Sequence, residues 1–280
     1  MLVSALLFTL QSVTPGVYTP EPIGQQTPPR AEQPIAPPAP GSIEQVLEDR
    51  FNLCMDKAVE DPSSAIIEAN IWMGEGGSFH ARHCIAFAYS RQQNWNLATA
   101  EFEKAAREAA GINDPRAGNL WAQAGNAALA GGNALRAISF FDTALARSDL
   151  SDAKRGEIHL DKARALVAQG LADNAAAEFA RVHELVPEDP LGWLLSATLA
   201  RRQGNLERAL ADITVAATLA PQDADIALEA GNIAVSSGDY AAARKNWQQA
   251  VAIKKDSQAA NTAREYLLRL DALEAEAATP

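Results

Sequence analysis

The chain has 280 residues, only 6% of them aromatic, and alanine is frequent throughout. This length allows one or two domains with a sizeable core, and the composition favours packed helices over sheets. The formal net charge of −11 argues against binding to nucleic acid or anionic lipid, since both need Lys and Arg to neutralise phosphate. The sequence therefore predicts an all-α protein.

Residues 1–14 contain an apolar run, LVSALLFTL at residues 2–10. The run is too short to span a bilayer as a helix, and it resembles the apolar core of a secretory signal. A basic stretch before it is absent, because the first Lys or Arg is Arg30. Residues 1–14 are therefore either a signal peptide or an apolar N-terminal tail on a chain that is not exported.

Residues 15–41 hold nine of the chain's 15 prolines and end in PIAPPAPG. Such a segment lacks many backbone donors, favours polyproline II and has too few large apolar groups to fold alone. We expect a disordered linker that acts as a semi-rigid tether. The alternative is a proline-rich ligand for a groove-type domain.

Residues 42–77 are expected to form a degenerate helix pair. Ser42 is followed by Gln45 in the spacing of a capping box. The stretch at 61–73 then carries small and large apolar residues at four- and three-residue steps, like the second half of a helix pair.

Three Asp-Pro pairs have the form of a helix start. They are Asp61-Pro62, Asp114-Pro115 and Asp189-Pro190. An aspartate that caps a helix is often followed by proline, because the first helical position needs no backbone donor. We therefore expect a helix to begin at each of these pairs.

A pattern repeats five times between residues 78 and 256. In four copies a glycine is followed, at steps of five, four and three residues, by three apolar residues, as in Gly132, Ala137, Phe141 and Ala144. An earlier copy keeps the steps but has glutamine in place of the glycine. The five copies begin at Gln93, Gly132, Gly170, Gly204 and Gly238.

A second helical segment precedes each glycine. Trp121 stands before Ala124-Gly125, and Trp193 stands before Ser196-Ala197. This spacing puts large and small residues on one helix face, where small residues let two helices cross closely. The following glycine permits the positive φ of a helix end. Each unit is therefore a helix, a short turn and a helix.

With this period and pattern, the units resemble tetratricopeptide repeats, here of a bacterial envelope type. The resemblance implies an α-solenoid with five repeats in residues 78–256, after the degenerate pair at 42–77. Residues 257–280 then form a capping helix and tail, which such stacks need to cover their exposed end.

Cys54 and Cys84, the only two cysteines, fall in the first helix of the degenerate pair and the first helix of the next unit. In such a stack these helices are neighbours, so a disulfide would join the irregular pair to the regular repeats. A disulfide favours a periplasmic or secreted protein over the cytoplasmic alternative. Two buried free thiols are the other interpretation.

The segment FHARHC, at residues 79–84, raises the question of a metal or catalytic site. His80 and His83 share a helix face, but Cys84 points toward the packing side and no nearby residue completes a four-ligand zinc site. We expect two solvated or groove-lining histidines. The sequence also lacks a glycine-rich phosphate loop and a G-x-S-x-G motif, so it predicts no metal, no cofactor and no enzymatic activity.

The resemblance implies that the first helices of successive units line a concave groove that binds peptides. The residues expected to face it are His83, Phe87, Arg91, Asn126, Arg164, Thr198, Arg201, Arg202 and Asn232. This polar to basic lining suits an extended segment with acidic residues or a free C-terminus. The alternative is that the arginines are solvated and bind nothing specific.

Two functions stay open. The protein is either a non-enzymatic scaffold or adaptor that binds a segment of a partner protein in the groove, or a structural spacer subunit of an envelope-associated complex that uses its convex face and ends. The partner is a protein in both cases, and we expect membrane contact only through an uncleaved N-terminal tail.

Overall fold

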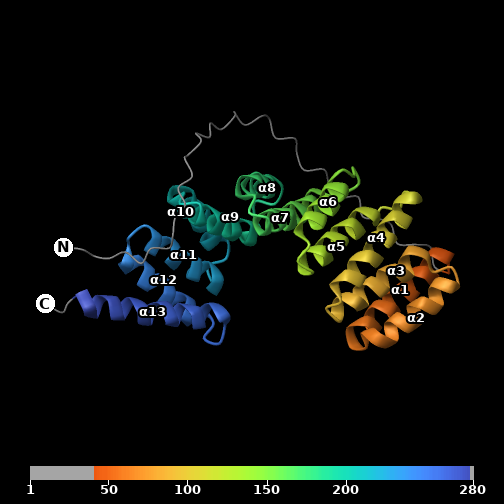
Figure 1. Cartoon of the computed structure of the whole chain (residues 1–280), viewed down its shortest axis with the longest axis horizontal. Coiled ribbons are helices and arrows are strands. Elements are labelled where there is room, and N and C mark those ends of the chain that lie inside the picture. The colour runs from red at the N-terminus through yellow and green to blue at the C-terminus, as the bar shows by residue number, and fades with distance from the viewer. Residues whose placement is uncertain (1–40, 278–280) are drawn as a thin grey trace. The chain divides into compact units, whose positions relative to one another are not determined.

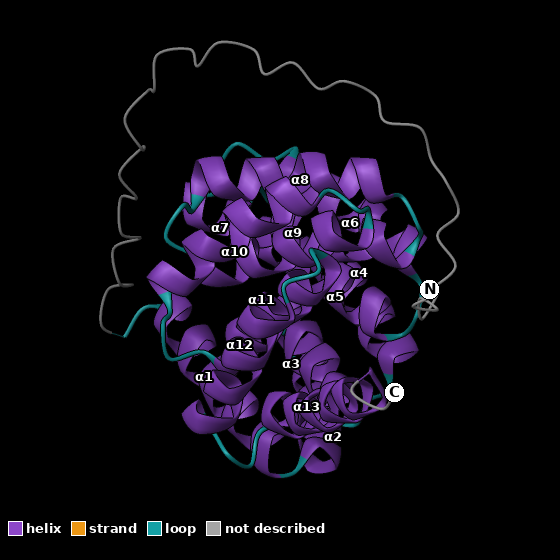
Figure 2. Cartoon of the chain, turned by 90° about the vertical axis from the view of Figure 1, so that its left-hand side faces the viewer, coloured by secondary structure: helices purple, strands orange, loops and turns teal. Residues whose placement is uncertain are grey.

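The computed structural model describes residues 41–277. These residues form thirteen helices joined by short loops, with no strand among them (Figure 2). The predicted signal or tail at 1–14 and the predicted linker, apart from Gly41, lie outside the described residues. No described helix is long and apolar enough to cross a membrane.

The helices are α1 (Ile43–Glu60), α2 (Pro62–Gly74), α3 (Ser78–Arg91), α4 (Trp95–Gly111), α5 (Ala117–Ala130), α6 (Ala134–Leu145), α7 (Asp152–Ala168), α8 (Ala172–Leu185), α9 (Pro190–Arg202), α10 (Leu206–Leu219), α11 (Ala224–Ser236), α12 (Tyr240–Ile253) and α13 (Gln258–Ala277). Each helix packs against the next (Figure 1), and first helices of neighbouring pairs, such as α1 and α3 or α9 and α11, also lie in contact. The described residues are therefore an all-α solenoid, as predicted.

The apolar residues of the repeated pattern form the contacts inside each helix pair. In α6, Ala137, Phe141 and Ala144 are fully buried, and the equivalent residues of the other four copies are buried as well. Those residues are Ala98, Phe102, Ala105, Ala175, Phe179, Val182, Ala209, Ile213, Ala216, Ala243, Trp247 and Ala250. The repeat that the sequence shows is thus a repeat of core positions.

The turn inside each pair requires a backbone conformation that favours glycine. The four glycines that open the later copies have φ between +74° and +80°. Gln93, which replaces glycine in the first copy, adopts the same left-handed conformation with φ +58°. This conformation costs a residue with a Cβ about 1 kcal/mol or more, so Gln93 is a strained position in a turn that glycine fits freely.

Replacing Gln93 with glycine is expected to raise the free energy of unfolding by about 1 kcal/mol. The relief of strain at φ +58° outweighs the extra backbone freedom that glycine gives the unfolded chain. Urea unfolding followed by circular dichroism measures the effect. Gly132→Gln, the reverse change at the equivalent position of the next repeat, should lower stability by a similar amount.

Of the three Asp-Pro pairs expected to start helices, two do so. The carboxylates of Asp61 and Asp189 cap α2 and α9, each with proline next in the chain. The prediction for Asp114-Pro115 was wrong, because α5 begins only at Ala117. The Asp114 carboxylate instead accepts hydrogen bonds from the backbone N–H and the guanidinium of Arg116, both at 2.9 Å, and so holds a turn before the helix.

The two ends of the described chain are built differently. At the N-terminal end, Cys54 of α1 and Cys84 of α3 lie at disulfide distance, with their Cα atoms 6.1 Å apart. At the C-terminal end, α13 packs Ala263 and Leu270 against α12. Arg244 of α12 adds ion pairs to two carboxylates of α13.

Candidate functional site

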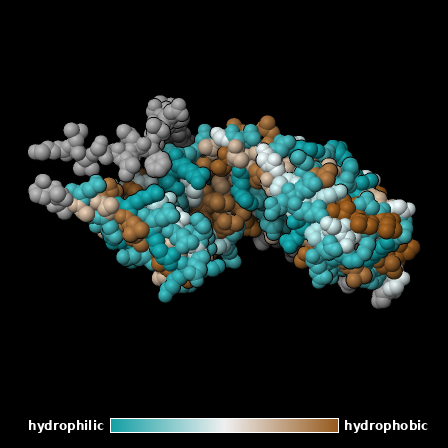
Figure 3. All heavy atoms as spheres, turned by 60° about the horizontal axis from the view of Figure 1, so that its bottom comes forward, coloured by the Kyte–Doolittle hydropathy of each residue, from teal (hydrophilic) through white to brown (hydrophobic). Residues whose placement is uncertain are grey.

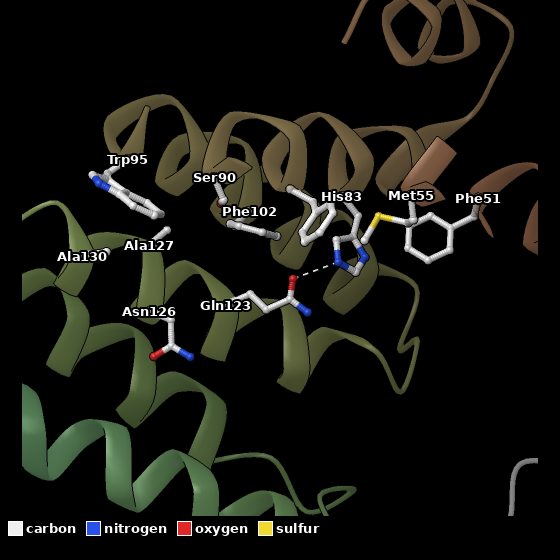
Figure 4. A pocket seen from close by; sticks show the side chains of 11 residues that line it. Phe51, Met55, His83, Ser90, Trp95, Phe102, Gln123, Asn126, Ala127 and Ala130 are labelled. Carbon is white, nitrogen blue, oxygen red and sulfur yellow. Dashed lines mark hydrogen bonds between the residues drawn. The ribbon is translucent and has the colours of Figure 1, made fainter. Parts of the chain in front are cut away.

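A pocket of about 560 Å³ opens between α1, α3, α4 and α5, at the N-terminal end of the stack (Figure 4). We call it the aromatic groove. It is lined by Phe51 and Met55 of α1, His83, Phe87 and Ser90 of α3, Trp95 and Phe102 of α4, and Gln123, Asn126, Ala127 and Ala130 of α5. Four aromatic rings and a methionine make most of this surface apolar.

The centre of the groove is a set of neighbouring rings. The ring of His83 lies 4.9 Å from that of Phe51 and 5.8 Å, edge-on, from that of Phe102, measured between centroids. Gln123 reaches from α5 toward the ring of His83 (Figure 4), and its Oε1 lies 2.8 Å from Nε2. Because an amide oxygen only accepts, Nε2 donates the proton of this hydrogen bond.

The groove holds His83 in its neutral form. Burial among the rings lowers the pKa of His83 to about 4, although the hydrogen bond with Gln123 partly opposes this. With a neutral imidazole, the part of the groove formed by α1, α3 and α4 carries no charge. It therefore favours an uncharged, apolar occupant over an ionic one.

His80 does not lie in the groove, and the expectation that it would be solvated or groove-lining was wrong. Its side chain is only 8% exposed and its ring stacks on that of Phe79, with centroids 4.0 Å apart. Burial and the nearby charge of Arg116 lower its pKa to about 4. The three-residue spacing predicted that His80 and His83 share a helix face. It could not show that α1 and α2 cover His80.

Acidification is expected to destabilise the fold through these two histidines. Their pKa values are about 4 in the folded chain and 6.5 ordinarily, so between these values the unfolded chain binds protons that the folded chain does not. Stability therefore falls as pH falls, by about 2 kcal/mol per histidine from pH 7 to pH 5 at about 1.4 kcal/mol per pKa unit. Urea unfolding at both pH values measures the loss, which His83→Gln should reduce by about half.

Three of the nine predicted groove residues line the aromatic groove: His83, Phe87 and Asn126. Asn126 is exposed at the rim, and its side chain points away from the rings (Figure 4). Arg91, at the end of α3, is exposed and does not line this groove. The other five lie further along the stack, on α7, α9 and α11.

The predicted basic lining on these later helices is largely paired within the chain. Arg201 donates to the carboxylate of Glu229 at 2.6 Å, and that carboxylate is buried. Asn232 donates to the same carboxylate at 3.0 Å, and Arg164 pairs with Asp161 of its own helix at 3.0 Å. These arginines are thus not free cations awaiting an acidic ligand.

Thr198 and Arg202 complete the predicted set. The Thr198 hydroxyl donates to the carbonyl of Leu194, one turn earlier in α9. Arg202 is exposed at the end of the same helix. Neither residue belongs to the aromatic groove.

Sequence reasoning missed most of the aromatic lining. Phe102 was recognised only as a core residue of the repeat, and it is indeed 3% exposed, yet it also forms the groove floor. Phe51 and Trp95 follow no repeated pattern. The one available signal was the gathering of aromatic residues in the first helices of the chain. Among residues 41–277, no group of His, Cys, Asp or Glu is placed to hold a metal ion.

Comparisons with known proteins agree with the fold. The sequence model of the tetratricopeptide repeat family matches residues 160–224, and no curated protein is detectably similar in sequence. The solved structure of PilW, a type IV pilus biogenesis factor, is similar with a TM-score of 0.65 and 20% identity, covering 78% of this chain and 98% of that one.

Two further structures show the same fold. PilF from Pseudomonas aeruginosa has a TM-score of 0.55 and 15% identity, covering 79% of this chain and 99% of its own. YrrB, described as a tetratricopeptide repeat protein with an unusual peptide-binding site, has a TM-score of 0.50 and 21% identity, covering 66% and 91%. At these identities the likeness concerns the fold.

Proposed function

Since this chain contains tetratricopeptide repeats and has their fold, we propose that it is a non-enzymatic scaffold that binds a segment of a partner protein in the aromatic groove. The observation that carries the proposal is a pocket of about 560 Å³ lined by four aromatic rings of α1, α3 and α4. Pockets of this size and apolar character are the usual form of a specific binding site.

The lining suggests which partner fits. Large apolar rings around a neutral His83 suit an aromatic or aliphatic side chain, because a charged group would lose its hydration there without gaining a partner. The amides of Gln123 and Asn126, along one side of the pocket, suit hydrogen bonds to the backbone of an extended segment. We therefore propose an extended segment with an apolar anchor residue.

The predicted acidic character of the segment has less support. Arg164 and Arg201 already have carboxylate partners in the chain, so a ligand carboxylate would have to displace them. Arg202, at the end of α9, is exposed. An acidic residue in the partner would therefore add to binding at the α9 end, outside the aromatic groove.

Peptides selected from a phage-displayed library of random sequences test the proposal. We expect the selected peptides to share an apolar residue and to bind the chain in solution. Gln123→Trp, at a position whose side chain points toward the rings, should fill the groove and weaken binding at least tenfold, as measured by fluorescence anisotropy. Gln248→Trp on the exposed side of α12 is the matched control. Equal binding to both variants would refute the groove as the binding site.

A second candidate function is that of a spacer subunit that uses its ends. The first helix pair exposes six large aliphatic side chains, and hydrophobic atoms gather on that end of the described chain, at the right in Figure 3. They are Ile43, Val46, Leu53, Val59, Ile67 and Ile71. A patch of this kind marks an interaction surface. Loss of complex assembly in a Leu53→Glu variant that still binds the selected peptides would favour this function.

We also propose that the protein works in an oxidising compartment, the periplasm or the exterior. The Cys54–Cys84 pair at disulfide distance supports this location, because stable disulfides belong to such compartments. The intact mass of the protein from its native host, with thiol alkylation before and after reduction, tests it. Two freely alkylated thiols in the native protein would point to the cytoplasm.

A further inference from the structure

We propose that the chain's own proline-rich segment PIAPPAP, residues 34–40, occupies the aromatic groove until a partner displaces it. The proposal rests on the proposed function, since it gives the groove an internal competitor. The segment ends immediately before Gly41, where the described residues begin, and α1, which follows at once, forms one wall of the groove.

The chemistry of the segment matches that of the groove. Proline-rich segments bind to grooves lined by aromatic rings, because their rigid polyproline II backbone loses little entropy and their rings pack flat on the aromatic faces. The groove offers Phe51, Phe87, Trp95 and Phe102. Residues 34–41 carry no charge, which suits a groove that keeps its histidine neutral.

The length of the segment matches the distance it would have to cover. Phe51 and Met55 stand eight and twelve residues after the start of α1 at Ile43, which is about 12 Å and 18 Å along a helix rising 1.5 Å per residue. A polyproline II chain advances about 3.1 Å per residue. Folded back along α1 from Gly41, it would bring Pro37 level with Phe51 and Ile35 level with Met55.

The backbone at the junction permits this reversal. Gly41 has φ +77°, a conformation that favours glycine, and a Cβ at this position would meet nothing within 4 Å. Ser42 then caps α1 through a hydrogen bond from the backbone N–H of Gln45, at 3.1 Å. The start of α1 is thus fixed, while the conformation of Gly41 permits a sharp change of direction in the chain before it.

The start of α1 is also fixed against the helices that carry the rest of the groove. Glu48 of α1 pairs with Arg116, just before α5, at 3.0 Å. The tether between groove and segment is therefore only a few residues long, which gives the segment a high effective concentration at the groove. The apparent affinity for a partner segment would then be its affinity for the open groove multiplied by the fraction of molecules in which the groove is open.

Photo-crosslinking in the full chain tests the contact. With benzoylphenylalanine in place of Gln123, whose side chain points into the groove, we expect crosslinks within one molecule to residues 34–40, located by fragmentation of the tryptic peptide 31–50. The same probe in place of Gln248 on α12 is the control. Absence of crosslinks to residues 34–40 from position 123, or equal crosslinks from both positions, would overturn the proposal.

Binding of a separate peptide with the sequence of the segment distinguishes failure of this proposal from failure of the proposed function. The labelled peptide AEQPIAPPAPG, residues 31–41, should bind a full-length variant with Pro34, Pro37, Pro38 and Pro40 all changed to serine at least fivefold more tightly than the unchanged chain. Gln123→Trp in the same variant should abolish binding. If the library peptides bind the groove but this peptide binds both chains equally, the segment does not fill the groove and the proposed function stands.

Discussion

Replacing Cys54 and Cys84 together by serine is expected to lower the free energy of unfolding by about 3 to 4 kcal/mol. The two cysteines are separated by 30 residues, and their Cα atoms lie 6.1 Å apart. In the chain-entropy view, a crosslink that closes a loop of this length restricts the unfolded chain and stabilises the folded one by about that amount. The loss should appear in urea unfolding of the oxidised protein.

The loss is expected to be local. In a solenoid each helix pair contacts only its neighbours, so the end pair opens most easily. The pair α1–α2 buries few large side chains, Trp72 being the main one, and the cysteines join it to α3. Hydrogen exchange measured by mass spectrometry should therefore speed up in residues 43–74 much more than in α9 to α12.

Reduction supplies the control for this experiment. The unchanged protein in dithiothreitol should unfold like the double variant, and the double variant should not respond to dithiothreitol. If oxidised and reduced protein unfold at the same urea concentration, the crosslink contributes nothing. Because Phe51 and Met55 of α1 line the aromatic groove, local opening of α1 should also weaken peptide binding there.

The second large effect is expected for Gly125→Ala in α5. A Cβ on Gly125 would lie 2.5 to 2.8 Å from three ring carbons of Phe141, and Phe141 is completely buried in α6. The ring has no free space to move into, so helices α5 and α6 would have to separate. Overpacking of this kind costs about 1 to 3 kcal/mol, more than the about 1 kcal/mol that alanine gains over glycine in a helix.

A matched glycine elsewhere shows whether the close contact is the cause. At Gly111, the last residue of α4, an added Cβ would meet nothing within 4 Å, so Gly111→Ala should be neutral or slightly stabilising. Replacing the ring with a smaller side chain, Phe141→Leu, in the Gly125→Ala chain should recover part of the lost stability. The effects of the two changes on stability are then not additive. Thermal unfolding followed by circular dichroism measures the unchanged chain, the single variants Gly111→Ala, Gly125→Ala and Phe141→Leu, and the double variant.

The sequence alone was sufficient for the repeat and its core. A period of 34 to 39 residues between Ala98, Ala137, Ala175, Ala209 and Ala243 predicted the helix pairs, because helix periodicity and burial are local properties that recur in each copy. The turn inside each pair could be predicted for the same reason, because a backbone position with positive φ strongly favours glycine. Even the exception, Gln93, was located by the steps of the pattern.

The tertiary structure alone decided the character of the groove. The sequence alone suggested that Arg201 is available to bind an acidic ligand, because its partner Glu229 is 28 residues away on another helix. His80 reads as a surface residue because nothing local shows that α1 and α2 cover it. The aromatic groove brings together residues of α1, α3, α4 and α5. Local periodicity fixes which side of a helix is buried, but only the packing of several helices determines which side chains meet in a pocket.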